Sequence, residues 1–382
     1  MIKSVNSIPA FDIKQQYATI ETEVSAAVLG VLASGRYIGG AAVTDFEQQF
    51  AAYHGVSECV ACNSGTDALF LGLRALGIGA GDEVITTPFT FFATTEVISA
   101  VGAIPVFVDI DATTFNLDVE KLKAAITPKT KGIIPVHLFG LPVEMTGLMA
   151  IAQSYNLAVI EDCAQATGAS WETQKVGSIG HVGCFSFYPT KNLGGCGDGG
   201  AIITNDPAIA TQLRVLREHG SKVRYIHEEI GVNSRLDAIQ AVILQIKLRY
   251  LDIWNHRRKQ IADYYYQHLS LVPGITAPQE SPGGVGVWNQ YTIRVTGEGR
   301  NGISGKYRDW VKNQMQEQGV NSMIYYPLPI HLQPVYKNLG YQPGQLPVSE
   351  QACHEVLSLP MFPELDQEQQ DKVIATLKYC LS

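Results

Sequence analysis

The stretch Phe185-Ser-Phe-Tyr-Pro-Thr-Lys191-Asn-Leu-Gly-Gly-Cys-Gly-Asp-Gly200 carries one lysine between an aromatic, strand-like run and a loop with five glycines. Glycine allows the backbone to approach a ligand closely, and loops on a rigid scaffold often carry function. Lysine condenses with aldehydes, and enzymes use it to hold pyridoxal phosphate (PLP) as a Schiff base. A solvated lysine beside a flexible turn is the alternative that this stretch alone leaves open.

The bulk properties are those of a soluble globular protein. A chain of 382 residues is too long for one compact core and suits two domains. It is 46% hydrophobic and 17% charged, and no apolar run reaches the ~18 residues that span a bilayer. The N-terminus lacks the apolar core of a signal peptide, so we expect a cytoplasmic protein without a membrane partner. The net charge of −8 argues against nucleic acid as a partner.

Cysteine usage points away from a metal or redox centre. The seven cysteines are scattered without a disulfide framework. Cys59 and Cys62 have the spacing of a redox or zinc motif, but no second Cys or His pair lies nearby in the sequence. We therefore expect buried strand thiols and no metal.

Short apolar runs alternate with helical patterns through the first half of the chain, which predicts an α/β fold. This rhythm is typical of a mostly parallel sheet covered by helices on both faces, with ligands beyond the carboxyl ends of the strands. The expected strands are 59–62, 83–87, 104–109, 132–136, 157–162, 183–187 and 200–204, and the expected helices are 68–76, 94–101, 119–126 and 145–155.

The second half changes character. A long helical pattern at 234–268 leads into Pro- and Gly-rich turns, a strand at 288–295 and helices at 306–318 and 366–381. We interpret residues 1–250 as a large ligand-binding domain and 251–382 as a smaller C-terminal α+β domain.

Several residues outside the lysine loop suit a phosphorylated, ring-shaped ligand. Asn63-Ser64-Gly65-Thr66-Asp67 precedes a helix, where free N–H groups favour phosphate, although an ordinary helix cap needs the same residues. Ser186 offers a further hydroxyl. Asp162 ends a strand and could pair with a pyridine nitrogen, or simply cap a turn.

Two further residues could contact the ring. Gln165 follows Asp162 by about one helical turn and could reach a ring hydroxyl. Phe91, in Pro88-Phe-Thr-Phe-Phe-Ala, could stack on the ring or belong to the core.

Five motifs in order resemble the DegT/DnrJ/EryC1/StrS family of PLP-dependent nucleotide-sugar aminotransferases. They are Ser-Gly-Thr-Asp-Ala-Leu, Ile-Glu-Asp-Cys-Ala-Gln-Ala, Ser-Phe-Tyr-Pro-Thr-Lys-Asn-Leu-Gly, Gly-Asp-Gly-Gly-Ala and Gly-Val-Asn-Ser-Arg-Leu-Asp. The resemblance covers nearly the whole chain and implies the type I PLP-dependent transferase (aspartate aminotransferase-like) fold. Cys163 and Cys196 stand where many relatives carry small residues. Lys191 is present, whereas a dehydrating subgroup has histidine there.

The resemblance also implies roles. Lys191 binds PLP covalently and moves a proton, while the other cofactor-binding residues are Gly65, Thr66, Phe91, Asp162, Gln165, Ser186 and Asn233. Asn233 would come from the partner subunit, which implies a homodimer with shared active sites. The implied reaction moves an amino group, usually from glutamate, to a keto group of a nucleotide-linked sugar.

The substrate is harder to predict than the chemistry. The segments around Arg235 and Tyr326 look most like relatives that aminate C3 of UDP-linked 3-keto-N-acetylglucosaminuronic acid, which would place both residues at the sugar. The basic run 214–235 could serve a diphosphate or uronate, or be a solvated face. A dTDP-linked 3- or 4-keto-6-deoxyhexose is the alternative substrate. A non-catalytic PLP-binding regulator and a dinucleotide oxidoreductase are the other classes, and the latter lacks Gly-x-Gly-x-x-Gly at a strand-to-helix turn.

Overall fold

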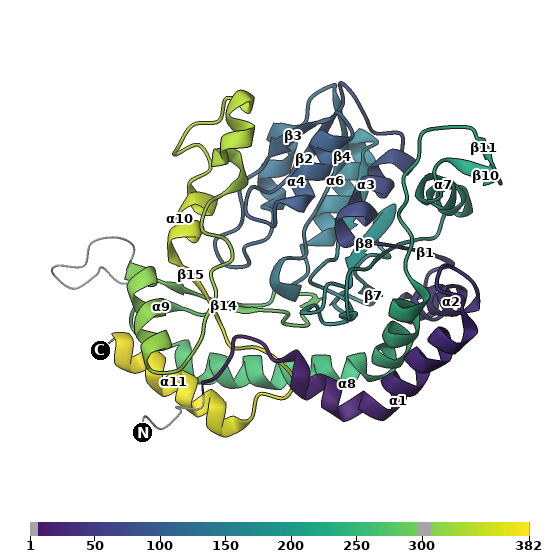
Figure 1. Cartoon of the computed structure of the whole chain (residues 1–382). Coiled ribbons are helices and arrows are strands. Elements are labelled where there is room, and N and C mark those ends of the chain that lie inside the picture. Colours follow the sequence, from purple (N-terminus) through teal and green to yellow (C-terminus); the bar gives the residue numbers. More distant parts are fainter. Residues whose placement is uncertain (1–6, 297–306, 382) are drawn as a thin grey trace.

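A seven-stranded sheet forms the central layer of the computed structural model, which describes residues 7–296 and 307–381 (Figure 1). Its strand order is β1-β9-β8-β5-β4-β2-β3. β9 runs antiparallel to both neighbours, and the other adjacent pairs are parallel, which confirms the predicted α/β fold with a mostly parallel sheet. The strands are β1 (Glu58–Cys62), β2 (Glu83–Thr86), β3 (Ile104–Phe107), β4 (Thr130–Ile133), β5 (Ala158–Asp162), β8 (Val182–Ser186) and β9 (Gly200–Thr204).

Helices cover both faces of this sheet because its strands are apolar on both sides. In β8, Val182 and Cys184 pack in one buried cluster with α3, α4 and α7, whereas Phe185 packs on the opposite face with α2 and α8. Cys59 and Cys62 are buried free thiols of β1. The helices are α2 (Ala41–His54), α3 (Gly65–Ala75), α4 (Ala93–Ala100), α5 (Val119–Leu122), α6 (Met145–Tyr155), α7 (Pro207–Arg217) and α8 (Ala238–Leu269).

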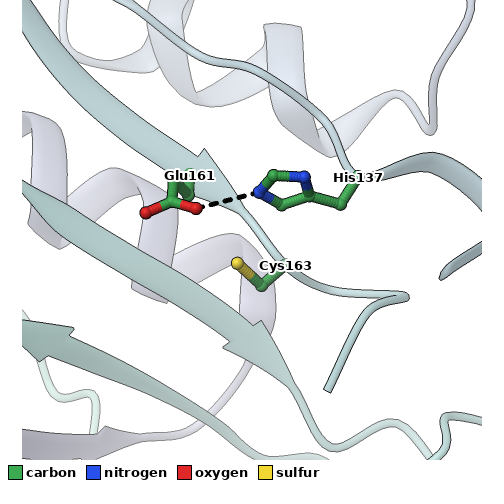
Figure 2. A group of neighbouring side chains, drawn as sticks. All are labelled: His137, Glu161 and Cys163. Carbon is green, nitrogen blue, oxygen red and sulfur yellow. Dashed lines mark hydrogen bonds and ion pairs between the residues drawn. The ribbon is translucent and has the colours of Figure 1, made fainter. Parts of the chain in front are cut away.

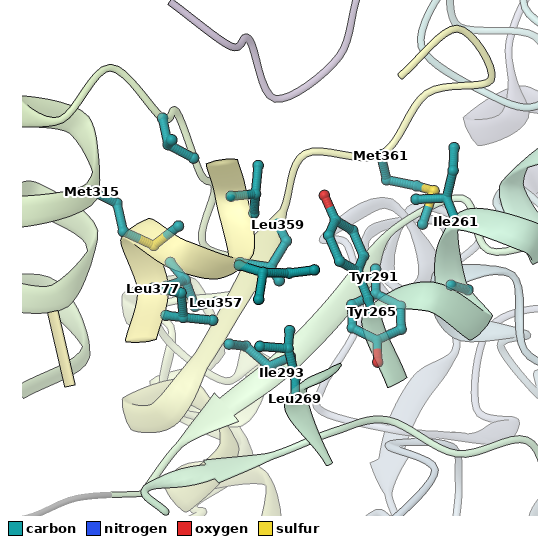
Figure 3. Close-up of a cluster of buried hydrophobic side chains, with 14 of the residues drawn as sticks. Ile261, Tyr265, Leu269, Tyr291, Ile293, Met315, Leu357, Leu359, Met361 and Leu377 are labelled. Carbon is teal, nitrogen blue, oxygen red and sulfur yellow. The ribbon is translucent and has the colours of Figure 1, made fainter. Parts of the chain in front are cut away.

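The C-terminal part has its own apolar core (Figure 3). Tyr265 from the end of α8 packs there with Tyr291 and Leu357, and Ile8 joins them from the N-terminal segment. The elements of this part are β12 (Ile275–Thr276), β14 (Tyr291–Val295), α9 (Tyr307–Glu317), α10 (Pro347–Glu355), β15 (Val356–Leu359) and α11 (Gln367–Leu381). α8 runs without interruption through residue 250, so the division there stays a prediction.

α1 (Ile13–Ser34) and α8 lie side by side (Figure 1), and several short strands form two small separate sheets. These are β6 (Ser170–Trp171), β7 (Gln174–Lys175) and β13 (Gly284–Val285) in one sheet, and β10 (Ser221–Val223) with β11 (Ile226–His227) in another. Within residues 7–296 and 307–381, no helix combines the length and apolar character needed to cross a bilayer.

The predicted long helix begins four residues too early. Residues 234–237 are instead drawn into tertiary contacts, because the Ser234 hydroxyl donates to Asn63 (3.3 Å) and the Ala238 N–H donates to the carbonyl of Tyr37 (2.9 Å). The sequence reading also omitted α10 and β15. Lys306, predicted to begin a helix, and the first six residues of the N-terminus, read for a signal peptide, lie outside the described residues.

Candidate active site

The lysine loop and Asp162 meet at one edge of the sheet. β5 and β8 are parallel neighbours, with Asp162 opposite Cys184, so Asp162 and Ser186 stand at adjacent strand ends. Lys191 follows β8 and interacts electrostatically with Asp162. The structure therefore brings together an amine and a carboxylate that are 29 residues apart in sequence.

The N-terminus of α3 lies against the end of β8. A Cβ on Gly65 would lie only 2.6 Å from Ser186 Cβ, and one on Gly200 would lie 2.3 Å from the carbonyl oxygen of Ser64. Ser64 caps the helix, its hydroxyl accepting from the N–H of Asp67 at 3.0 Å. Gly65, Thr66 and Ser186 are thus adjacent, with the free N–H groups and positive dipole end of α3 available to an anion.

The Asp162 side chain is buried, with 4% of the residue exposed, and its carboxylate accepts hydrogen bonds from two uncharged donors. The Thr94 hydroxyl donates to one carboxylate oxygen at 2.8 Å, and the Ala164 N–H donates to the other at 3.1 Å. Burial raises the pKa of Asp162, while these hydrogen bonds and the charge of Lys191 oppose the rise. A positively charged partner, such as a protonated pyridine nitrogen, would stabilise the ionised form of this buried carboxylate.

Burial has the opposite effect on Lys191. It lowers the pKa of the half-buried amine from 10.5 to about 8, because removal from water disfavours the ammonium form, and Asp162 only partly compensates. The lowered pKa therefore makes more of Lys191 a neutral amine near neutral pH than an ordinary lysine would be, and the neutral amine is the form that attacks an aldehyde and accepts a proton.

Gln165 links the site to Tyr326. Its side-chain oxygen accepts from the Phe139 N–H at 2.6 Å, which fixes the amide so that Nε2 donates to the Tyr326 hydroxyl at 3.1 Å. Burial raises the pKa of Tyr326, so the phenol stays protonated, and its proton is free for another acceptor. Phe91 lies beside Tyr326, with ring centroids 6.4 Å apart, and is 58% exposed. An exposed aromatic ring there suits stacking on a ligand.

Asn233 and Arg235 both contact Glu218. Asn233 is exposed and forms a bridge with Glu218, and Arg235 Nη1 contacts the Glu218 carboxylate at 3.4 Å. Among the described residues, no hydrogen bond or ion pair connects either to Lys191 or Asp162. Their predicted contacts with cofactor and substrate stay predictions.

The basic run 214–235 is largely occupied within the chain. Arg217 pairs with Glu47 at 2.5 Å and Lys222 with Glu228 at 2.9 Å, while Arg224 lies over the ring of Tyr225. These contacts favour the reading of the run as a set of internal pairs rather than a ready anion site.

The chemistry of the site fits PLP. Gly65 lies so close to Ser186 that a side chain would not fit there, and the backbone N–H groups at the start of α3 can bind a phosphate. The carboxylate of Asp162 suits a protonated ring nitrogen, and Lys191 supplies an amine of lowered pKa. The sequence reading missed Thr94, because only the fold shows that a hydroxyl after β2 reaches Asp162 from the neighbouring helix. It also missed the contact between Gln165 and Tyr326, which are 161 residues apart.

Comparison with known proteins gives a consistent picture. A model of the DegT/DnrJ/EryC1/StrS aminotransferase family matches residues 18–378. A relative named "pleiotropic regulatory protein" from Geobacillus stearothermophilus is 47% identical, the alignment covering 96% of this chain and 97% of the relative. UDP-2-acetamido-2-deoxy-3-oxo-D-glucuronate aminotransferase of Pseudomonas aeruginosa is 42% identical, with 94% and 96% covered.

A third relative, dTDP-3-amino-3,4,6-trideoxy-alpha-D-glucose transaminase of Streptomyces venezuelae, is 42% identical, with 97% of this chain and 95% of the relative covered. Among solved structures, DesV of S. venezuelae in complex with a ketimine intermediate superposes with a TM-score of 0.94 at 41% identity. That alignment covers 98% of each chain.

Proposed function

The chain belongs to the DegT/DnrJ/EryC1/StrS aminotransferase family, and we propose that it aminates C3 of UDP-linked 3-keto-N-acetylglucosaminuronic acid or a close analogue. That it is a PLP-dependent sugar aminotransferase of the type I fold is shown by the family and its structural neighbours. The observation that carries the chemistry is the position of Lys191, an amine of lowered pKa, at the same sheet edge as buried Asp162, with which it interacts electrostatically.

Residues of this chain would hold PLP in defined places. We assign the phosphate to Gly65, Thr66 and Ser186, and the pyridine nitrogen to Asp162. Phe91 would stack on the ring, and Gln165 would lie near the ring hydroxyl.

When bound, PLP supplies an electron sink for the bond broken at the amino donor's Cα. Lys191 would be the base that takes the Cα proton, because its lowered pKa favours the neutral amine. Asp162 would lie at the ring nitrogen, where its negative charge would favour a bound proton. The Tyr326 hydroxyl, with Gln165 donating to its oxygen, can donate to an oxygen of the sugar.

The substrate assignment rests on likeness and on local chemistry. Two of the relatives act on sugars that carry nitrogen or oxygen at C3, which supports amination at that position. We propose that Arg235 faces the anionic part of the substrate and Tyr326 the sugar. A dTDP-linked keto-deoxyhexose is the alternative that the Streptomyces relative supports.

We further propose glutamate as amino donor, a cytoplasmic location and a homodimer in which Asn233 reaches the partner's phosphate site. The exposure of Asn233 and its lack of contact with Lys191 support a role across a subunit interface. The regulatory name of the relative from Geobacillus keeps a non-catalytic regulator as the second candidate. A regulator would retain the visible band of bound PLP on mixing with glutamate.

The experiment that tests the function has two steps. Glutamate is expected to abolish the visible band of the wild type, and a panel of keto nucleotide sugars is then added to the pyridoxamine-loaded enzyme. Return of the band with the UDP-3-keto-uronate supports the proposal, and return only with dTDP-sugars refutes the UDP assignment. Lys191→Ala is expected to lose both turnover and the wild-type band, and an unchanged visible spectrum in that variant would contradict the role of Lys191.

A further inference from the structure

Three buried side chains lie together behind the sheet edge that carries Asp162: His137, Glu161 and Cys163 (Figure 2). Their polar atoms lie within 4.8 Å of one another. Because consecutive strand residues point to opposite faces, Glu161 faces away from the side of the sheet that Asp162 serves. Such a group could hold a metal or could be a hydrogen-bond network, and the partners of each atom distinguish the two.

The Glu161 carboxylate is fully occupied. One oxygen accepts from the N–H groups of Ile179 (2.8 Å) and Gly180 (2.6 Å). The other accepts from the Gly177 N–H (2.7 Å) and from His137 Nε2 (3.0 Å). A carboxylate has about four lone-pair positions, and all of them are used here. No position remains for a metal ion.

The states of His137 and Cys163 also differ from those of metal ligands. The Val143 N–H donates to His137 Nδ1 at 3.1 Å, so the ring proton sits on Nε2 and points at Glu161. Burial, reinforced by the charge of Glu161, raises the pKa of the Cys163 thiol, which stays protonated. Glu161 and His137 therefore form a hydrogen-bonded pair that is satisfied by backbone groups, and Cys163 lies beside it as a neutral thiol.

This network connects directly to the backbone of Asp162. The Asp162 N–H donates to the Pro135 carbonyl at 2.9 Å, and the His137 N–H donates to the Asp162 carbonyl at 3.1 Å. The backbone of segment 135–137 therefore hydrogen-bonds to both the N–H and the carbonyl of Asp162. The imidazole of His137, in the same segment, hydrogen-bonds to Glu161. A shift of His137 would move Asp162 with it.

The same carboxylate also fixes the segment that leads into β8. Its three backbone donors lie in loop 177–180, where Gly177 has φ +90°, a conformation that favours glycine. A Cβ on Gly183 in β8 would lie 2.3 Å from Gly177 Cα, so loop and strand touch. β8 ends at Ser186, and the loop that follows it carries Lys191. Glu161 therefore contacts the segments next to both β5 and β8, the strands that lead into the active site.

We propose that Glu161, acting through His137 and loop 177–180, is a positioning residue that sets the placement of Asp162 relative to β8 and Lys191. This inference rests on the proposed function for its catalytic consequence. Glu161→Gln replaces one acceptor oxygen by an NH2 group. That group cannot accept a hydrogen bond, so the N–H donors that face it lose their acceptor. Asp162 then loses its bracing while its own side chain is intact.

The chain offers a matched control in Glu350. Its carboxylate also accepts from a histidine, His331 Nε2 (3.2 Å), and from the backbone N–H groups of Gly344 (2.8 Å) and Leu346 (3.2 Å). Glu350→Gln removes the same kind of interaction without touching the backbone partners of Asp162. Both variants are expected to lower Tm.

Three readouts separate positioning from stability. In Glu161→Gln we expect faster amide hydrogen exchange in peptide 158–166 of the cofactor-free chain, an altered visible circular dichroism of bound PLP, and kcat reduced about 10-fold with KM nearly unchanged. Glu350→Gln should leave all three at wild-type values. Equal behaviour of the two variants, or wild-type exchange and kcat in Glu161→Gln, would overturn the proposal.

Two variants of His137 test the same proposal if Glu161→Gln does not fold. His137→Gln retains an N–H donor for Glu161, whereas His137→Leu removes it, so the former should rescue the dichroism and kcat that the latter loses. No difference between them refutes the role of His137. A wild-type chain that shows no visible band with PLP would instead refute the proposed function, while the exchange measurement on the cofactor-free chain still decides the positioning role.

Discussion

Replacing Lys191 with methionine removes a titratable amine whose pKa is lowered by burial, while keeping a long side chain. In the folded, cofactor-free protein, burial lowers the pKa of this amine from 10.5 to about 8. The unfolded chain keeps the ordinary value, so between these two pH values the unfolded state binds more protons than the folded one. The free energy of unfolding must therefore rise with pH over this range.

The magnitude follows from the two pKa values. A lowering from 10.5 to about 8 corresponds to about 3 kcal/mol of folding free energy that is missing at low pH. About 2.5 kcal/mol of it returns between about pH 7 and about pH 10. Lys191→Met lacks this term, so the variant is expected to be more stable than the wild type near neutral pH, and the gap should close as the pH rises.

Urea unfolding of the cofactor-free wild type and of Lys191→Met, at one protein concentration and several pH values, measures this difference. Titrating groups that do not interact with Lys191 affect both proteins alike and cancel, and Asp162, which does interact with it, titrates on the acid side of this pH range. A stability difference that does not change with pH would refute the lowered pKa of Lys191. A wild type that loses stability relative to the variant as the pH rises would refute even its sign.

Two further predictions concern the surroundings of the same site. Thr94→Val removes the 2.8 Å donor to Asp162, and we expect a loss of about 1–2 kcal/mol in urea unfolding and a higher apparent pKa on the acid side of the kcat/KM profile. Thr95→Val removes a buried hydroxyl that has no hydrogen-bond partner among the described residues, so it is the control and should cause neither the loss of stability nor the pKa change. Gly65→Ala places a methyl group 2.6 Å from Ser186 Cβ, so we expect about 1–3 kcal/mol of destabilisation and a weaker PLP affinity by absorbance titration.

The sequence could predict the sheet and its ligand edge because each strand is a continuous apolar run between helical patterns. It could also single out Lys191 and Asp162 as candidates, since a lysine before a glycine loop and an acid at a strand end suit PLP, but each position alone also fits an ordinary turn, and the ordered family motifs were needed to choose. It could not predict the donors to Asp162, because Thr94 comes from a different βα unit. The start of α8 was misplaced for a similar reason, since residues 234–237 follow tertiary hydrogen bonds rather than their helical pattern.

The distribution of charge bears on how an anionic substrate is bound. Most cations of segment 214–235 already pair with acids, and the chain carries a net charge of −8, so a diphosphate finds few free cations on this surface. Arg235 differs from Arg217 in that its pair with Glu218 is long and partly exposed, at 3.4 Å against 2.5 Å. Exposed pairs of this kind contribute about 0–1 kcal/mol, so exchange of Glu218 for a substrate phosphate or uronate costs little. We infer that, of these two acid-paired arginines, Arg235 is better able to serve the substrate, whereas Arg217 holds β1 to α2.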